Sequence, residues 1–136
     1  MTTSLSGACS CGSVKYHVAA DLRRLVNCHC NMCRKMNGSA FSSYAVIPHK
    51  ALALSGEENM VQYHVTESAR KHFCKKCGTP LFNVNVKYPA VCMLYLGSLG
   101  SADHAPSVNV FCESMLGWVE NIGSMTRIEQ GFRTFP

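Results

Sequence analysis

The sequence predicts a mainly β domain with little helix, and three observations lead to this prediction. Short segments alternate between apolar and polar residues, which is the period of a β-strand. Glycine and proline separate these segments repeatedly along the chain. Seven of the nine cysteines lie in three tight clusters, a spacing that suits metal ligands held in small turns. We expect the 136 residues to form a single domain, 1–136, without a dividing linker.

Alternation and β-branched content predict the strands in order. Val14, Tyr16 and Val18 alternate with polar residues just after the first cysteine pair. Residues 90–96 are continuously apolar, which is typical of a strand buried on both faces. The predicted strands cover residues 14–18, 40–47, 61–65, 70–73, 81–86, 90–96 and 108–111. Helical periodicity is weak, and it favours only a turn at 32–37 and a short piece at 114–118.

Two cysteine pairs predict a structural zinc site. Cys74 and Cys77 are spaced to grip one metal ion from a tight turn, and Gly78 suits the positive φ such a turn often needs. Cys9 and Cys11 lie two residues apart, so in extended backbone both thiols face one side. We assign Cys9, Cys11, Cys74 and Cys77 to one closed zinc site. The alternative is that one of these pairs is simply buried in the core.

The middle cluster predicts a second zinc with an open position. Cys28, Cys30 and Cys33 supply three thiols, which leaves a fourth position for water or a substrate thiol. His29 lies between two of them and should point the other way in extended backbone, so we do not assign it as a ligand. A residue elsewhere in the chain would make this site structural instead. Iron also suits thiolate ligands, but its sites usually show other spacings.

Composition and charge limit the cellular location and the binding partners that we expect for this protein. The N-terminal residues lack the pattern of a signal peptide, and the longest apolar stretch, 90–99, is too short to span a bilayer. We therefore expect a cytoplasmic protein whose clustered cysteines bind metal rather than form disulfides. Seven thiolates and two zinc ions would reduce the formal charge of +5 to about +2, which argues against nucleic acid as a partner. Cys92 and Cys112 lie in apolar runs and are expected in the core.

The three motifs resemble the glutathione-dependent formaldehyde-activating enzymes, a family that also includes centromere protein V. The resemblance rests on residues 7–16, on 28–34 followed by 38–41, and on 73–81, with weaker support from 56–58 and 111–118. It implies an Mss4-like zinc-bound β-sheet fold. It also implies a structural zinc on the four paired cysteines and a second zinc on the other three. Asn109 is a departure, because the family often has a histidine at this position.

The resemblance implies a carbon–sulfur lyase that joins glutathione and formaldehyde into S-hydroxymethylglutathione. Cys28, Cys30 and Cys33 would hold the working zinc, and glutathione or another small thiol would bind beside it as thiolate. Arg34 or Lys35 would hold a substrate carboxylate or remain solvated, and His29, His64 and His72 are weak candidates for acid–base chemistry. The oligomeric state and the substrate-binding residues stay open.

Two other functions stay open at this stage. One is a non-catalytic, zinc-stabilised binding module whose basic pairs contact an acidic partner, as the membership of centromere protein V suggests. The other is a redox sensor that releases zinc from the open cluster when its thiols are oxidised.

Overall fold

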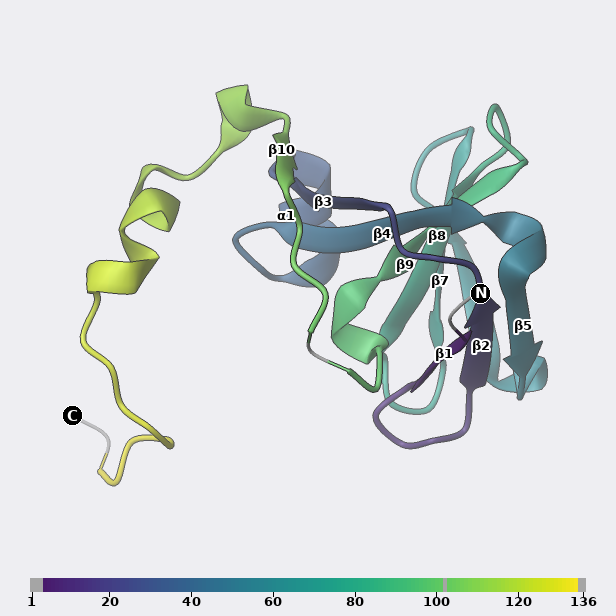
Figure 1. The fold of residues 1–136 in the computed structure, drawn as a ribbon, viewed down its shortest axis with the longest axis horizontal. Helices are drawn as coiled ribbons and strands as arrows, with labels where there is room; N and C mark the ends of the chain where they lie inside the picture. The colour runs from purple at the N-terminus through teal and green to yellow at the C-terminus, as the bar shows by residue number, and fades with distance from the viewer. Residues whose placement is uncertain (1–3, 102, 135–136) are drawn as a thin grey trace.

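The computed structural model describes residues 4–101 and 103–134, and in them the chain is mainly β (Figure 1). A three-stranded antiparallel sheet has the order β1-β2-β5, and a seven-stranded sheet has the order β10-β3-β4-β9-β8-β7-β6. The small sheet consists of β1 (Ser4–Ala8), β2 (Lys15–Ala19) and β5 (Leu52–Ser55). The strands of the large sheet are β3 (Arg24–Cys28), β4 (Ser42–Pro48), β6 (Met60–His64), β7 (Ala69–Cys74), β8 (Pro80–Asn85), β9 (Val91–Tyr95) and β10 (Val108–Val110).

Helical segments are short. The described residues contain one α-helix, α1 (Asn31–Asn37), and the other helical segments are 3₁₀ turns. These turns are η1 (His49–Ala51), η2 (Glu57–Asn59), η3 (Leu96–Ser98), η4 (Cys112–Ser114) and η5 (Gly117–Ser124). No helix in the described part of the chain is long and apolar enough to cross a membrane.

The core lies between the two sheets. Alternate residues of β2, among them Tyr16 and Val18, are buried against Ile47 of β4, Leu81 of β8 and Leu94 of β9. The exposed residues between them face solvent, as the alternation predicts. The central strand β9 pairs with both β4 and β8, which explains its continuous apolar run.

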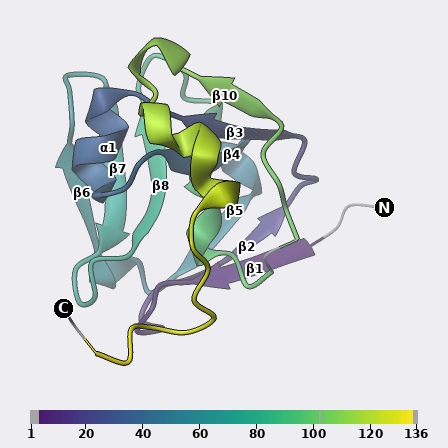
Figure 2. The same cartoon turned by 90° about the vertical axis from the view of Figure 1, so that its left-hand side faces the viewer.

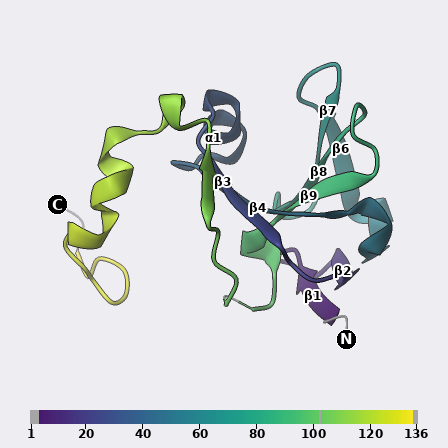
Figure 3. The same ribbon diagram turned by 45° about the horizontal axis from the view of Figure 1, so that its top comes forward.

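Strand β10 pairs with β3 in parallel, with Asn109 opposite Asn27. Figure 2 shows β10 alongside β3 at the edge of the large sheet. The chain then passes through η4 and leaves the sheets, and Figures 1 and 3 show η5 standing away from them. Large apolar side chains in this arm, including Trp118 and Ile122, are about half exposed.

The predicted strands and the helix at 32–37 are confirmed, whereas three strands escaped prediction. The segment predicted at 114–118 is helical only in part, since it falls across the end of η4 and the start of η5. The strands β1, β3 and β5 are short and lack clear alternation, and each is held by pairing with its neighbours in a sheet.

Candidate metal centres

Four thiols from distant parts of the chain meet at one point. Cys9 and Cys11 lie in the turn after β1, while Cys74 ends β7 and Cys77 lies in the turn before β8. Their four sulfur atoms all lie within 4.8 Å of one another. The Sγ atoms of Cys11 and Cys74, from residues 63 positions apart, are separated by 3.8 Å. This arrangement matches the tetrahedral set of four thiolates that a structural zinc ion takes.

Hydrogen bonds from the turns favour ionisation of two of these thiols, Cys11 and Cys77. The hydroxyl of Thr79 lies 3.1 Å from the Sγ of Cys77 and, together with nearby backbone groups, lowers the pKa of that thiol to about 5. Hydrogen bonding from Ser13 lowers the pKa of the Cys11 thiol. The backbone amide of Val14 donates to the Sγ of Cys9 over 3.3 Å. Such hydrogen bonds favour the thiolate, the form that binds metal.

Glycine completes the second of these turns as predicted. Gly78 has a φ of +79°, and its amide donates to the carbonyl oxygen of Cys74 over 2.8 Å. A side chain at this position would strain the backbone, whereas glycine adopts the left-handed conformation without cost. The turn therefore returns the chain toward β8 directly after Cys77.

The other three thiols lie where β3 passes into α1. Cys28 is the last residue of β3, Cys30 caps the N-terminus of α1, and Cys33 lies in its first turn. Their sulfur atoms also lie within 4.8 Å of one another, with 3.5 Å between those of Cys28 and Cys33. The backbone amide of Cys33 donates to the Sγ of Cys30 over 3.2 Å. The cap and the strand end thus bring three sulfurs together within six residues of chain.

Burial in the second cluster disfavours a thiolate unless a cation lies beside it. Burial raises the pKa of the Cys33 thiol to about 12, so at neutral pH its thiolate needs a neighbouring positive charge. Cys28 is buried, whereas Cys30 and Cys33 are half-buried. Three sulfur donors with partial solvent access fit zinc with one open coordination position.

His29 points away from the thiols, as its place between Cys28 and Cys30 predicts. Its ring is buried, and Nε2 lies 2.9 Å from the Oδ1 of Asn109. The ring also packs on Phe41, with 5.0 Å between the ring centroids. No described carboxylate or thiol joins it in a metal-binding group. His29 therefore joins the cluster to β10 and Phe41.

The other polar residues considered from the sequence lie elsewhere. Arg34 donates to the backbone oxygens of His29 and Ser114 and to the side chain of Asn31, so its guanidinium has a structural role. The side chain of Lys35 is exposed. His64 is exposed on β6, and His72 stacks on Phe82 with 4.3 Å between centroids. Neither histidine lines the cavity beside Cys33.

Sequence reasoning missed a polar network behind Cys33. The Oη of Tyr44 lies 3.4 Å from the Sγ of Cys33, and Asn83 donates to Tyr44 while accepting from Tyr95. Lys71 is buried nearby on β7. A signal was available for Lys71: it shares one strand face with Ala69 and Phe73, which places a charged residue on an otherwise apolar face.

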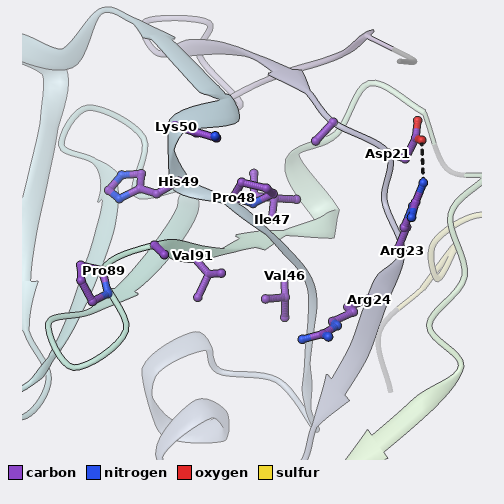
Figure 4. A pocket seen from close by; sticks show the side chains of 12 residues that line it. Asp21, Arg23, Arg24, Val46, Ile47, Pro48, His49, Lys50, Pro89 and Val91 are labelled. Atoms are coloured by element: carbon purple, nitrogen blue, oxygen red, sulfur yellow. Dashed lines mark ion pairs between the residues drawn. The ribbon is translucent and has the colours of Figure 1, made fainter. Parts of the chain in front are cut away.

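A wide hollow in the described surface lies away from both cysteine clusters. The hollow has a volume of about 810 Å³. It lies where η1 approaches the first residues of β3 and β9 (Figure 4). The side chains of Arg24 and Lys50 line it, and Asp21 pairs with Arg23 at its edge over 3.6 Å. Size alone would select this hollow as the active site, but no thiol lines it.

The two remaining cysteines differ from each other. Cys92 is buried in the core as predicted, and burial raises the pKa of its thiol to about 12. The prediction for Cys112 is wrong, because this residue is exposed in η4 with its Sγ 3.5 Å from the carbonyl oxygen of Asn109. The apolar run that suggested burial ends at the edge strand β10, beyond which the chain leaves the sheets.

Comparison with known proteins identifies the family. The sequence pattern of the glutathione-dependent formaldehyde-activating enzymes matches residues 4–114, a range that includes both cysteine clusters. The chain belongs to this family. A Halomonas elongata protein named "Putative glutathione-dependent formaldehyde-activating enzyme" is 27% identical over 127 residues, covering 85% of this chain and 80% of that protein.

Other proteins match parts of the chain. An uncharacterized lyase of Schizosaccharomyces pombe is 30% identical over 76 residues, which cover 56% of this chain and 54% of that protein. A Phaeosphaeria nodorum protein with the same name as the Halomonas protein is 34% identical, over 54% of this chain and 40% of its own length. A crystal structure of a Rhodobacter sphaeroides protein shares the fold, with a TM-score of 0.60 and 20% identity over 76% of this chain and 97% of that chain.

Proposed function

We propose that this protein is a zinc-dependent carbon–sulfur lyase that joins glutathione and formaldehyde into an S-hydroxymethyl adduct. The observation that carries the proposal is the convergence of Cys28, Cys30 and Cys33 within 4.8 Å, beside a small cavity that Cys33 lines. Family membership and the names of the relatives support the reaction class. We infer a cytoplasmic location, because clustered thiols stay reduced and free to bind metal in that compartment.

The two cysteine sets would hold two zinc ions with different tasks. Cys9, Cys11, Cys74 and Cys77 would hold a structural ion, since four thiols leave no coordination position open. Cys28, Cys30 and Cys33 would hold the working ion. When bound there, zinc would lower the pKa of an incoming thiol and keep it as thiolate at neutral pH.

The residues around the second set hold the ligands in place. The amide of Cys33 donates to the Sγ of Cys30, and the hydroxyl of Tyr44 lies beside the Sγ of Cys33. Hydrogen bonds of this kind orient metal ligands and tune their charge. Arg34 fixes α1 to the carbonyl oxygen of Ser114, which keeps the cluster against the end of β10.

The reaction itself needs a thiolate and an electrophilic carbon. The thiolate sulfur attacks the carbonyl carbon, a C–S bond forms, and the C=O π pair moves to oxygen, which takes up one proton. One thiol and one aldehyde thus give one hydroxymethyl thioether, with no oxidant or reductant consumed. A site that holds the thiolate next to the aldehyde accelerates this step by removing the cost of bringing the two together.

The test compares Cys30→Ser with Cys112→Ser in the zinc-loaded protein. Exchange spectroscopy with ¹³C-formaldehyde and glutathione measures the rate of adduct formation above the uncatalysed rate. We expect Cys30→Ser to lose one of two zinc ions and the catalysed rate while keeping its circular dichroism spectrum. Cys112→Ser should keep both, because that thiol lies outside the two clusters. Full turnover by Cys30→Ser, or no catalysis by the native protein, contradicts the proposal.

A further inference from the structure

Lys71 is a buried cation that has no carboxylate partner among the residues that the structure describes. Its side chain lies on β7 with 7% of its surface exposed, and its Nζ lies 5.9 Å from the centroid of the Tyr95 ring. The Nζ donates to the carbonyl oxygen of Met36 over 2.6 Å and to the Oδ1 of Asn37 over 2.7 Å. The ion pairs found among residues 4–101 and 103–134 both lie on the surface and do not include Lys71.

A purely structural role does not account for this charge. The two acceptors belong to the last turn of α1, and a neutral amide donor on β7 would satisfy them without burying an ammonium group. Burying a charge without a counter-charge costs several kcal/mol, so such groups are retained where they act. The burial lowers the pKa of Lys71, and the thiol of Cys33 opposes this effect.

Lys71 and Cys33 line the same small cavity. Its volume is about 50 Å³, and its polar side is formed by Tyr44, Asn83 and Tyr95. Arg70 also lines it, and Met32, Met36, Val65 and Ala69 form its apolar side. A cavity of this size holds only a molecule of a few heavy atoms, since a single water needs roughly 10–15 Å³ on the same measure. Met32, which is 44% exposed, lies at its outer edge. The cavity is too small for glutathione but large enough for a one- or two-carbon aldehyde.

Hydrogen bonds of Asn83 hold the two tyrosines of the polar side in place. Asn83 donates from Nδ2 to the Oη of Tyr44 over 3.3 Å and accepts from the Oη of Tyr95 over 3.1 Å. The two tyrosine rings pack with 4.8 Å between centroids. An ammonium group has three N–H bonds, and two of those on Lys71 are used by α1. One N–H of Lys71 is therefore not used by α1.

We propose that Lys71 is a catalytic residue, which binds the oxygen of a one- or two-carbon carbonyl substrate in this cavity and protonates it. The inference rests on the proposed lyase function and names the group that handles the carbonyl oxygen. As the thiolate sulfur forms its bond to the carbonyl carbon, the π pair moves to the oxygen, and the Lys71 ammonium donates a proton to it. The Lys71 amine then takes up one proton, which balances the proton that the thiol released on binding. A fixed cation where negative charge develops stabilises the transition state.

The experiment uses formate as a probe, because formate is a one-carbon anion with oxygens like those of the attacked aldehyde. Saturation-transfer NMR measures its contact with the zinc-loaded protein, with neither glutathione nor turnover involved. Lys71→Gln keeps an amide donor for α1 but removes the charge, and Lys87→Met is the matched control on an exposed loop. We expect formate to bind at least about tenfold more weakly to Lys71→Gln, from the loss of one charge-assisted hydrogen bond, and equally well to Lys87→Met. Butyrate, with four carbons, should not compete.

The native protein alone can also overturn the proposal. If formate bound to the native protein shows no nuclear Overhauser effect between its proton and the ring protons of Tyr95 or Tyr44, formate is not in this cavity. Unchanged formate binding by Lys71→Gln overturns it as well.

Turnover separates this inference from the proposed function. With glutathione and formaldehyde, Lys71→Gln should lose about 100-fold in kcat while its affinity for glutathione is unchanged. Formate bound at Lys71 in a protein without lyase activity would refute the function and leave the anion site standing. Lyase activity that survives in Lys71→Gln would refute the role of Lys71 and leave the function standing.

Discussion

The Nε2 of His29 lies 2.9 Å from the Oδ1 of Asn109, and this contact joins the segment between two clustered cysteines to strand β10. Since an amide oxygen only accepts, the Nε2–H of His29 is the donor. Asn109 also accepts from the Nδ2 of Asn27 over 3.3 Å. The asparagine that stands where the family often has a histidine therefore has a clear structural task, which is to hold His29 and the parallel pairing of β3 with β10.

Replacing Asn109 with alanine should destabilise the protein by about 1–3 kcal/mol, because the buried Nε2–H of His29 loses its acceptor. Urea unfolding followed by circular dichroism measures this change. Val108→Ala in the same strand is the control, since Val108 is 50% exposed and should cost little. Equal stability of the two variants would show that the contact contributes nothing.

In the zinc-loaded protein that we propose, Cys77→Ser should remove one of two zinc ions and lower the free energy of unfolding by more than about 3 kcal/mol, because a metal ion bound at this site would contribute directly to folding. The expected loss of stability is large because the site closes a long loop, since Cys11 and Cys74 lie 63 positions apart. Cys30→Ser should also lose one ion but cost less stability, since its three ligands lie within six residues of chain. Zinc content by mass spectrometry and unfolding by urea check both statements, and equal destabilisation by the two variants would contradict them.

Gly56→Ala should destabilise the protein by more than about 2 kcal/mol. Gly56 has a φ of +79°, and a Cβ built there would lie 1.9 Å from the backbone oxygen of Ser13, beside the four-cysteine site. Gly123→Ala is the matched control, because nothing lies within 4 Å of its Cβ position. Thermal unfolding of both variants measures the difference. A Gly56→Ala protein as stable as Gly123→Ala would show that the loop shifts freely.

The buried thiol of Cys92 should make stability fall at alkaline pH. Burial raises its pKa to about 12 from an ordinary value of 9.0, so above pH 9 the unfolded thiol ionises while the folded thiol keeps its proton. The free energy of unfolding then falls as the pH rises, by at most about 1.4 kcal/mol per pH unit. Cys92→Ala lacks this effect, so the stability advantage of the native protein over the variant should shrink between pH 8 and pH 10.5. A constant difference over that range, measured by urea unfolding, would contradict the burial of this thiol.

The sequence predicts the local parts of this structure and fails where distant segments decide. Period-two alternation predicts β2 and β8, and spacing alone selects the cysteines that converge into two groups. β3 escapes prediction because it is stabilised by pairing with β4 and with β10, which lies some 80 residues away. The strand pattern places Lys71 on an otherwise apolar face, but its hydrogen bonds to α1 join segments about 35 residues apart, so the sequence does not predict them.

The wrong prediction of a buried Cys112 has a different cause. Its apolar neighbours are consistent with burial, yet β10 is an edge strand whose outer neighbours face solvent. Local hydrophobicity does not reveal whether a strand is central or at an edge, and that position determines the exposure of the residues that follow it.

The wide separation of Cys11 and Cys74 has a consequence for the newly made chain. While the ribosome adds the residues between Cys33 and Cys74, which takes a few seconds at roughly 5–20 residues per second, the five earlier clustered thiols are already available. A metal ion that arrives in that interval meets Cys9 and Cys11 together with the middle cluster, and this set offers enough sulfurs for a closed but wrong shell. Reaching the proposed arrangement would then require ligand exchange once Cys74 and Cys77 emerge. We therefore expect the supply and timing of metal during translation to influence how much of this protein reaches its native state.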